Sequence, residues 1–420
     1  MDESLVFLWF MFMLFMMSSQ NKPPIDPLEQ NALYHLLNSI NPTIPWTTLF
    51  PDDLCVTAPS FVVCESHRQQ NQTSKSHIVE LTFPPCSPNS TLDPSLFTPF
   101  PYLRKISFSN CFNNMHISLP SFPPSIQELV FIDNPSLVSP LEPFLRNLTS
   151  LKKLVLVGNG FYGELPTNIG SFHNLEQLNL SRNNLSGEVP TSIGMLEKLE
   201  ILDLSHNDFK GCVPEQVGNL VNLLKLNLSQ NGFACKIPES FIHLKKLEYL
   251  DLSFNRFGNF GVPLFLGKFH KMKELHLSGN SLSGKIPEIW KKLGGVEKVG
   301  FSKMDLVGEI PASMGIHLKN LSYLGLDNNN LEGPVPKEFR FLLKIANEIN
   351  LENNNLSGRI TFICGGGVGG NKLKLGGNVG LYVENKNDSC PGDVIFNGGS
   401  LQLFDPLVLV LLFIIFFVFT

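Results

Sequence analysis

Three copies of one pattern, spaced by 24 residues, constrain this chain more than any other feature of its sequence. They begin at Leu175, Leu199 and Leu223, and each reads L-x-x-L-x-L-x-x-N, with Val-Pro or Ile-Pro further on. Leucines alternate with polar residues in each copy, which predicts a short strand whose leucines share one face. One such strand cannot bury its leucines alone, whereas stacked copies bury them together. The period therefore predicts a single α/β repeat solenoid, although 420 residues would otherwise suggest two or three domains.

The period extends in both directions, in steps of 23 to 25 residues, and predicts about twelve coils. The first apolar position of each coil is Ile78, Leu103, Ile126, Leu151, Leu175, Leu199, Leu223, Leu247, Met272, Val296, Leu321 and Ala346. The Asn that ends each copy is expected to bond backbone groups along the stack. The first three coils and the last match the pattern less well, and the coil from Val296 has Met304 at the Asn position.

The repeats resemble the plant-specific class of extracellular leucine-rich repeats, whose pattern is LSGxIPxxIGxLxxLxxLDLSxN. Residues 187–190 (GEVP), 284–287 (GKIP) and 308–311 (GEIP) carry this resemblance. The chain is similar to plant receptor-like proteins without a kinase domain, in particular to the "too many mouths" and "Piriformospora indica-insensitive" types. The resemblance implies a right-handed leucine-rich-repeat solenoid of 24-residue coils with a cap at each end. It also implies a plasma-membrane protein that binds an extracellular peptide, carbohydrate or receptor-kinase ectodomain and signals through a partner kinase.

The expected organisation follows the composition of the chain. Residues 1–19 contain a continuous apolar run of 13 residues, which indicates a signal peptide. Residues 20–77 are expected to form the N-terminal cap, 78–363 the repeats, and 364–397 a C-terminal cap and stalk. In the first cap, Asp26, Pro27 and Glu29 occupy the positions of a helix cap, a first helical residue and a capping-box acid.

The last segment, residues 398–420, is a hydrophobic tail with two interpretations. Asn397, Gly398 and Gly399 are small, and a short spacer and an apolar run follow them, which is typical of a glycolipid-anchor signal with Asn397 as the attachment residue. A plain membrane span is the alternative. Either reading predicts that the chain passes through the secretory pathway and stays on the outer face of the plasma membrane.

Eight cysteines in a chain with a signal peptide indicate disulfides. Cys86 and Cys111 occupy the same position in adjacent coils, and stacked strands lie about 4.8 Å apart, within the range that a disulfide spans. The expected pairs are Cys55–Cys64, Cys86–Cys111, Cys212–Cys235 and Cys364–Cys390. Buried free thiols are the alternative.

Nine N-x-S/T sequons predict N-linked glycans on an extracellular chain. They begin at Asn71, Asn89, Asn147, Asn179, Asn184, Asn227, Asn320, Asn355 and Asn387. Several arise from the N-L-S wording of the repeat, so Asn71, Asn89, Asn147 and Asn387 are the more informative ones. Asn179 and Asn227 are expected on the strands of the concave side, where glycans would block part of that surface.

Binding residues are expected among the strand positions that face away from the leucines. Positions two, four, six and seven after the first apolar residue face the concave side, and exposed aromatic or Arg residues there are typical of binding hot spots. The first candidate patch is Arg182, His206, Gln230, Tyr249 and Phe254. The second is Val130, Ile132, Val155 and Val157, four apolar residues at outward positions of two consecutive coils. Packing against the N-terminal cap, or a register slip in weak coils, could also explain the second patch, and inert solvated positions could explain the first.

Other function classes find little support in the sequence. No kinase motif set, H-E-x-x-H or G-x-S-x-G motif occurs, so an enzyme, a cofactor and a metal site are not expected. The formal net charge of −5 without a basic run argues against nucleic-acid binding. A wall-associated inhibitor of microbial hydrolases, similar to the polygalacturonase-inhibiting proteins, is the alternative to a receptor-like protein. The hydrophobic tail favours the receptor-like protein.

Overall fold

The structure is a computed structural model that describes residues 23–57, 61–67, 74–83, 86–87, 90, 97–111, 122–360, 362 and 372–382. Residues 1–22 and 383–420, which hold the expected signal peptide, stalk and tail, lie outside the described residues. The chain divides into two compact units. The first unit comprises Met1–Ala234 and Pro238–Lys246, and the second comprises Cys235–Ile237 and Leu247–Thr420.

A small α/β cap begins the first unit. It contains the helices α2 (Pro27–Ile40), α3 (Trp46–Leu49) and α4 (Leu54–Thr57), and the strand β1 (Val62–His67), which pairs antiparallel with β2 (Lys75–Thr82). The predicted helix start is confirmed, because the Asp26 side chain accepts a hydrogen bond from the backbone N–H of Leu28 and Pro27 is the first helical residue. Leu33, Leu36, Leu37 and Ile40 of α2 are buried, as the apolar spacing predicts.

Glu29 does not act as the capping-box acid that the sequence predicts. Its side chain is buried, Oε2 accepts a hydrogen bond from the backbone N–H of Ile78 at 2.7 Å, and Oε1 lies 2.5 Å from Nδ1 of His77. The carboxylate therefore joins helix α2 to the first parallel strand. This long-range contact overrides the local cap, because a buried carboxylate needs partners that the helix end alone does not supply.

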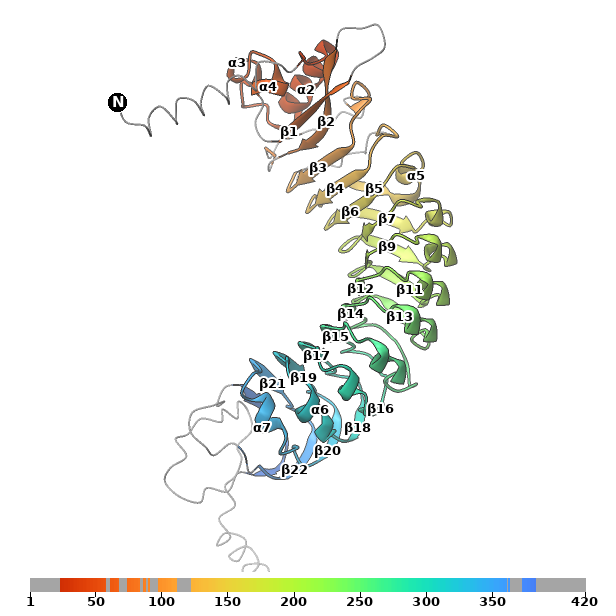
Figure 1. Ribbon diagram of the computed structural model, residues 1–420, viewed down its shortest axis with the longest axis vertical. Helices are drawn as coiled ribbons and strands as arrows, with labels where there is room; N and C mark the ends of the chain where they lie inside the picture. The colour runs from red at the N-terminus through yellow and green to blue at the C-terminus, as the bar shows by residue number, and fades with distance from the viewer. Residues whose placement is uncertain are drawn as a thin grey trace, which may run out of the picture. The chain divides into compact units, whose positions relative to one another are not determined.

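Parallel strands in continuous register form the main sheet of the first unit (Figure 1). After β2 they are β3 (Lys105–Ser109), β4 (Glu128–Ile132), β6 (Lys153–Val157), β8 (Gln177–Asn179), β10 (Ile201–Asp203) and β12 (Lys225–Asn227). Their leucines and phenylalanines point inward and are almost fully buried, which confirms the predicted solenoid of stacked coils.

From the coil that starts at Ile126 onward, each coil of the first unit continues away from the main sheet into a second sheet and a short helix. The second sheet contains β5 (Val138–Pro140), β7 (Gly160–Glu164), β9 (Asn184–Gly187), β11 (Asp208–Cys212) and β13 (Gly232–Ala234). The helices are α5 (Leu141–Leu145) and the 3-10 helices η2 (Ile169–Ser171), η3 (Thr191–Met195), η4 (Glu215–Asn219) and η5 (Glu239–His243). The Val-Pro and Ile-Pro pairs stand directly before η3, η4 and η5, where Pro fixes the backbone as the chain enters the helix.

The second unit repeats this construction. Its main sheet contains β14 (Tyr249–Asp251), β15 (Glu274–His276), β17 (Lys298–Gly300), β19 (Tyr323–Gly325), β21 (Glu348–Asn350) and β23 (Leu373–Lys374). Its second sheet contains β16 (Gly284–Lys285), β18 (Leu306–Glu309), β20 (Asn330–Gly333), β22 (Asn355–Arg359) and β24 (Gly380–Tyr382). Its helices are η6 (Leu264–Lys268), η7 (Trp290–Lys292), α6 (Ala312–His317) and α7 (Phe339–Leu342).

Two coils of the second unit differ from the expected pattern. Residues 372–382, expected in the C-terminal cap, form a further coil, with Leu373, Leu375 and Leu381 buried and β23 paired with β21. The coil that starts at Leu247 carries one extra residue, and its described residues form no strand of the second sheet. Its loop instead exposes Phe260, and the Gly261 backbone N–H donates to the carbonyl of Leu282 at 2.8 Å.

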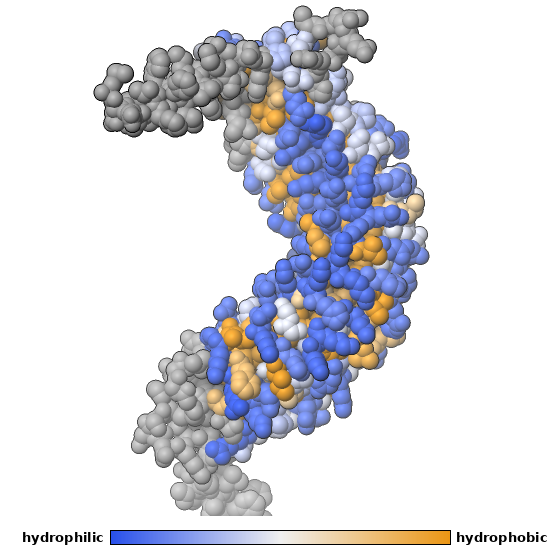
Figure 2. Space-filling model, in the orientation of Figure 1, coloured by the Kyte–Doolittle hydropathy of each residue, from blue (hydrophilic) through white to orange (hydrophobic). Residues whose placement is uncertain are grey.

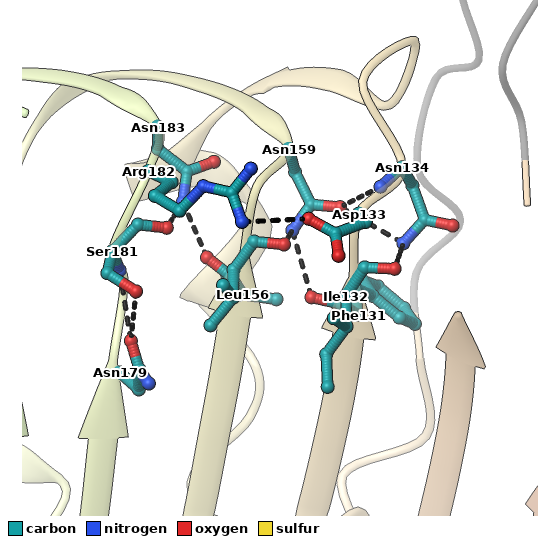
Figure 3. A network of polar contacts seen from close by, with 11 residues as sticks. Phe131, Ile132, Asp133, Asn134, Leu156, Asn159, Asn179, Ser181, Arg182 and Asn183 are labelled. Carbon is teal, nitrogen blue, oxygen red and sulfur yellow. Dashed lines mark hydrogen bonds and ion pairs between the residues drawn. The ribbon is translucent and has the colours of Figure 1, made fainter. Parts of the chain in front are cut away.

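The Asn that ends each strand pattern ties neighbouring coils together, as predicted. Oδ1 of Asn207 accepts a hydrogen bond from the backbone N–H of Leu185 in the preceding coil at 3.0 Å. Nδ2 donates to the carbonyl of Leu180 in that coil at 2.9 Å and to that of Leu204 in its own coil at 3.1 Å. We call these residues the asparagine ladder: Asn134, Asn159, Asn183, Asn207, Asn231, Asn255, Asn280, Asn329, Asn354 and Asn378. Figure 3 shows the first three of them. In the coil that starts at Val296, Met304 fills this position with a fully buried apolar side chain instead.

Two of the expected disulfides are present in the structure. Cys55–Cys64 joins α4 to β1 with a Cα–Cα distance of 5.6 Å, and Cys86–Cys111 has a Cα–Cα distance of 4.7 Å. Cys212 and Cys235 are each disulfide-bonded. Cys364 and Cys390 lie outside the described residues.

Candidate partner-binding face

In each unit, the side chains that alternate with the buried leucines form a surface on the main sheet. We call this surface the strand face, and it consists of the residues two, four, six and seven positions after the first apolar residue of each coil. Side chains on such a sheet are held by a rigid ladder of paired strands, so the strand face can present a fixed pattern to a partner.

The second candidate patch lies together on adjacent strands of the first unit. Val130 pairs with Val155 and Ile132 pairs with Val157 across β4 and β6 in an unbroken parallel register. A register slip is therefore excluded as the explanation of this patch. Val130, Ile132 and Val157 are half-buried, whereas Val155 is only 5% exposed. We call these four residues the apolar patch.

The apolar patch departs from the polar character of the same column in later coils. The positions that correspond to Val130 and Val155 are occupied by Asn179, Asp203 and Asn227 in the next three strands. Because the fold tolerates polar side chains there, the stacking of coils does not by itself require Val130 and Val155. Figure 2 shows apolar side chains gathered in separate patches among mainly hydrophilic ones on the visible surface.

Charged side chains border the apolar patch. Nζ of Lys105 lies 3.6 Å from a carboxylate oxygen of Glu80 and 3.8 Å from one of Glu128, which places three charges in one row across β2, β3 and β4. On the other side, Arg182 Nη1 lies 3.4 Å from Asp133 Oδ1 (Figure 3). These ion pairs are partly exposed, so each adds little to the stability of the fold. They surround the apolar patch with charged side chains.

Arg182, His206 and Gln230 of the first candidate patch lie on three consecutive coils of the first unit. Their backbone N–H groups link the coils, because Arg182 donates to the carbonyl of Ser205 and His206 to that of Ser229, both at 2.9 Å. All three side chains are exposed. Tyr249 and Phe254, the other members of that patch, belong to the second unit, so the structure does not establish the five residues as one site.

A backbone feature of position seven was not anticipated from the sequence. Arg182, His206 and Gln230 have φ values of 58°, 53° and 55°, in the left-handed region that L-residues with large side chains disfavour. The same conformation recurs at Asp133, Gly158, Phe254, Gly279, Lys303, Asn328 and Asn353, so the turn before the asparagine ladder imposes it. The mixture of Gly, Asn and Asp with larger residues in this column was the signal that could have revealed it.

In the second unit, aromatic side chains lie close to glycines of the strand face. An added Cβ at Gly279 would come within 2.6 Å of the Phe254 ring, and one at Gly325 within 2.7 Å of the Tyr323 hydroxyl oxygen. Phe254 remains 46% exposed. The Tyr249 hydroxyl lies 3.3 Å from Oδ2 of Asp251, and its ring centroid lies 6.0 Å from that of His276.

Charged residues that the sequence did not single out accompany these rings. Glu274 contacts Nζ of Lys298 at 3.0 Å and Nε2 of His276 at 3.2 Å. Partial burial acts to raise the pKa of Glu274, but the hydrogen bonds from Lys298 and His276 lower it overall. Burial, with the nearby Asp327 and Glu348, raises the pKa of Tyr323. The repeat period gives the position of Glu274, His276 and Lys298 on their strands. Only the pairing register of the folded sheet shows that their side chains meet.

Other expected features can be placed only in part. Among the described residues, no cluster of three or more His, Cys, Asp or Glu side chains is arranged to hold a metal ion. A search of the same residues finds no helix with the length and apolar character of a membrane span. Asn71, Asn89, Asn387 and Asn397 lie outside the described residues.

The fold and the strand face together define a repeat protein in which stacked coils present paired strands on one surface. The chain belongs to the leucine-rich-repeat family, since the family model described as "Leucine-rich repeat region" matches residues 102–333. Two curated proteins of Arabidopsis thaliana are similar to parts of it. "Piriformospora indica-insensitive protein 2" is 34% identical over 153 residues, which is 34% of this chain and 36% of that protein. "Receptor like protein 29" is 28% identical over 170 residues, which is 37% of this chain and 36% of that protein. The matched stretches thus span about a third of either relative.

Solved structures of plant receptor ectodomains share the fold. The ectodomain of the Arabidopsis membrane receptor kinase GASSHO1/SCHENGEN3, in complex with CASPARIAN STRIP INTEGRITY FACTOR 2, has a TM-score of 0.58 and 28% identity, over 69% of this chain and 37% of that one. The ectodomain of the Arabidopsis receptor kinase HAESA, in complex with an IDA peptide hormone, has a TM-score of 0.61 and 25% identity, over 84% of this chain and 61% of that one.

Proposed function

We propose that this chain is a plant cell-surface receptor-like protein that binds an extracellular peptide or a receptor-kinase ectodomain on its strand face and signals through a partner kinase. The observation that carries the proposal is the apolar patch, four apolar side chains on paired strands at positions where the next three coils carry Asn, Asp and Ser. The free energy falls when a partner removes apolar side chains at outward positions of a rigid sheet from water, and this favours binding.

The similar proteins support this proposal. Two curated relatives are plant proteins, one of them named as a receptor-like protein, and two structural relatives are ectodomains of receptor kinases, one of them in complex with a peptide hormone. Since the matched stretches cover only part of each relative, the ligand class and the partner kinase are proposals for this chain.

We further propose that the chain is extracellular and attached to the plasma membrane through residues 398–420. The support is the sequence of that segment, with small residues at 397–399 followed by an apolar run. A partner kinase is part of the proposal because the chain is similar to a protein named as a receptor-like protein and to the ectodomain of a receptor kinase.

The test is capture of the tagged full-length protein from crosslinked plant cells, with its partners identified by mass spectrometry. A double variant, Ile132→Lys with Val157→Lys, places two charges in the apolar patch. Val221→Lys is the matched control, since Val221 is 50% exposed in the turn after η4, outside the strand face. We expect receptor kinases with the wild-type and control proteins and their loss with the double variant, because buried unpaired charges strongly oppose binding.

Other outcomes would decide against the proposal. Equal recovery of kinases by all three proteins would remove the apolar patch from the interface. Recovery of secreted hydrolases without a kinase would contradict the receptor-like function and support the wall-associated inhibitor. Thermal unfolding of each purified variant shows whether a lost partner reflects a lost fold. The variant Arg182→Ala with Phe254→Ala, run in parallel, tests members of the first candidate patch.

A further inference from the structure

Six N-x-S/T sequons lie within the described residues, and the fold separates them into two groups. We infer that N-linked glycans occupy Asn147, Asn184, Asn320 and Asn355 and are excluded from Asn179 and Asn227, so that the strand face stays free of glycans at these positions. This inference rests on the proposed extracellular location, since only a chain that enters the secretory pathway receives such glycans.

The first group lies at the two borders of the strand face and is exposed to solvent. Asn147 follows α5 and Asn320 follows α6, so both stand where the chain turns toward the next main-sheet strand. Asn184 and Asn355 are the first residues of β9 and β22, directly after a ladder Asn. The side chains of these four residues form no hydrogen bond with the part of the chain that the structure describes. Their amide nitrogens can therefore carry a bulky glycan without loss of a structural contact.

The second group lies on the strand face itself and is occupied with internal contacts. Asn179 is the last residue of β8, and its Oδ1 accepts hydrogen bonds from the backbone N–H of Ser181 at 3.0 Å and from the Ser181 hydroxyl at 2.8 Å (Figure 3). Asn227, the last residue of β12, makes the same two contacts with Ser229, at 3.1 and 2.8 Å. Its Nδ2 also donates to Oδ2 of Asp203 at 3.3 Å.

The hydroxyl residues of the sequons are also more buried in the second group than in the first. Ser181 and Ser229 are only 7% and 6% exposed, and each hydroxyl is bound to the Asn of its own sequon. Thr149 and Ser357, the hydroxyl residues that follow Asn147 and Asn355, are exposed. Ser186 and Ser322, which follow Asn184 and Asn320, are half-buried, and the Ser322 hydroxyl donates to the carbonyl of Glu297 at 2.9 Å. A glycosyl-transferring enzyme must reach both the Asn amide and the hydroxyl two residues later, so a paired strand of this kind is a poor acceptor once it has formed.

Crowding on the strand face acts in the same direction. Asn179 stands between Val155 and Asp203 on the neighbouring strands, and such strands are about 4.8 Å apart. A sugar ring linked to its amide would spread over these neighbours and over the half-buried outward positions beside them. Glycans confined to the borders would instead leave the apolar patch and Arg182 accessible to a partner.

The experiment is site-resolved mass spectrometry of the full-length protein secreted or displayed by plant cells. Enzymatic release of glycans in heavy-oxygen water marks each formerly glycosylated Asn as heavy Asp, so the occupied fraction is read at every sequon. We expect at least about tenfold lower occupancy at Asn179 and Asn227 than at the four exposed residues. Asn184→Gln and Asn355→Gln should each remove the mass of one glycan, whereas Asn179→Gln and Asn227→Gln should leave the glycan mass unchanged.

The outcomes separate this inference from the proposed function. High occupancy at Asn179 and Asn227 alongside the exposed residues would overturn the glycan pattern and leave an extracellular receptor-like protein possible. Occupancy at Asn71, Asn89 or Asn387 but at none of the six would overturn the pattern alone, whereas occupancy at none of the nine sequons would also contradict passage through the secretory pathway. Unoccupied exposed residues beside occupied strand-face residues would overturn the inference alone.

Discussion

At the scale of single residues, the hydrogen bonds of the asparagine ladder account for the recurrence of Asn at one position of most coils. Each ladder Asn satisfies backbone groups of two coils at a point where the chain turns and the strand ladder can no longer do so. A buried N–H or carbonyl without a partner costs about 1–3 kcal/mol, which exceeds the net value of most single hydrogen bonds. The ladder is therefore a structural requirement of the stack, which separates it from the variable residues beside it.

This role gives a prediction for Asn207. Asn207→Ala removes its hydrogen bonds to Leu185, Leu180 and Leu204 and leaves buried backbone groups unpaired. We expect the free energy of unfolding to fall by about 2 kcal/mol. Chemical denaturation followed by circular dichroism measures the change. Asn219→Ala is the control, because Asn219 is exposed at the end of η4, and an equal loss in both variants would contradict the role assigned to the ladder.

Two carboxyls of the N-terminal cap predict opposite responses to pH. Burial raises the pKa of Glu29, although contacts with His77 and Ile78 oppose this, whereas a hydrogen bond with Lys75 lowers the pKa of Asp26. The folded chain thus retains the Glu29 proton where the unfolded chain has released it. The contribution of Glu29 to stability must fall as pH rises from about 4.3 toward its raised folded pKa. The contribution of Asp26 is complete above about 3.9 and is lost as pH falls through its lowered folded pKa.

Denaturation midpoints measured against pH test this pair. Glu29→Gln should flatten the decline in stability just above pH 4.3, and Asp26→Asn should reduce the loss at the most acidic pH values. The charged and titratable groups that contact the two carboxyls are His77 and Lys75, which both variants keep. Curves for Glu29→Gln that run parallel to wild type through that window would contradict the assignment.

At the scale of elements, glycines in the 3-10 helices set how closely successive coils stack. An added Cβ at Gly170, Gly194 or Gly218 would come within 2.5 Å of a carbonyl oxygen or side-chain carbon in the next coil. The Ile-Gly and Val-Gly pairs of the repeat therefore mark backbone contact between neighbouring helices, rather than a need for unusual φ values. Side chains in this position would force the coils apart on the side opposite the main sheet.

Gly194→Ala tests this close approach. The new methyl group would lie 2.5 Å from the Gln216 carbonyl oxygen and 2.7 Å from its Cβ, so η3 and η4 must separate. We expect a loss of about 1–3 kcal/mol in the free energy of unfolding, the usual cost of overpacking. Gly258→Ala is the control, since an added Cβ there meets no atom within 4 Å. A neutral Gly194→Ala variant would show that the helices can separate without cost.

At the scale of the whole molecule, the two proposals concern different parts of the repeat: partner binding uses the strand face, and the glycans lie at its borders. In each unit, the main sheet offers a strand face, and two turns at its borders carry exposed sequons, Asn147 and Asn184 in the first unit and Asn320 and Asn355 in the second. A partner bound to the apolar patch and glycans at Asn147 and Asn184 can therefore coexist in the first unit. Loss of kinase capture in the apolar-patch variant, together with border-only glycans, would support both proposals independently.

The sequence predicted which residues of the candidate site share one face of the sheet, but not how exposed their side chains are. The period placed Val130, Ile132, Val155 and Val157 on one face, because alternation along a strand is a local property. It could not show that Val155 is nearly buried, since that depends on the neighbouring coil. The cluster of Glu274, His276 and Lys298 was missed for the same reason. The positive φ of Arg182, His206 and Gln230 was missed, although Gly, Asn and Asp recur in the same column.

The sequence by itself determined the repeat, the inward leucines, the asparagine ladder and the helix start at Asp26, because each depends on residues close together in the chain. Tertiary structure decided the rest. Glu29 binds the backbone N–H of Ile78 instead of capping its own helix, and residues 372–382 form a further coil. The coil from Leu247, which carries one extra residue, forms no strand of the second sheet in its described residues. In each case a contact between distant segments outweighs a local preference of the chain. The physical reason is that pairing a buried polar group contributes more to the free energy of folding than the local preference does.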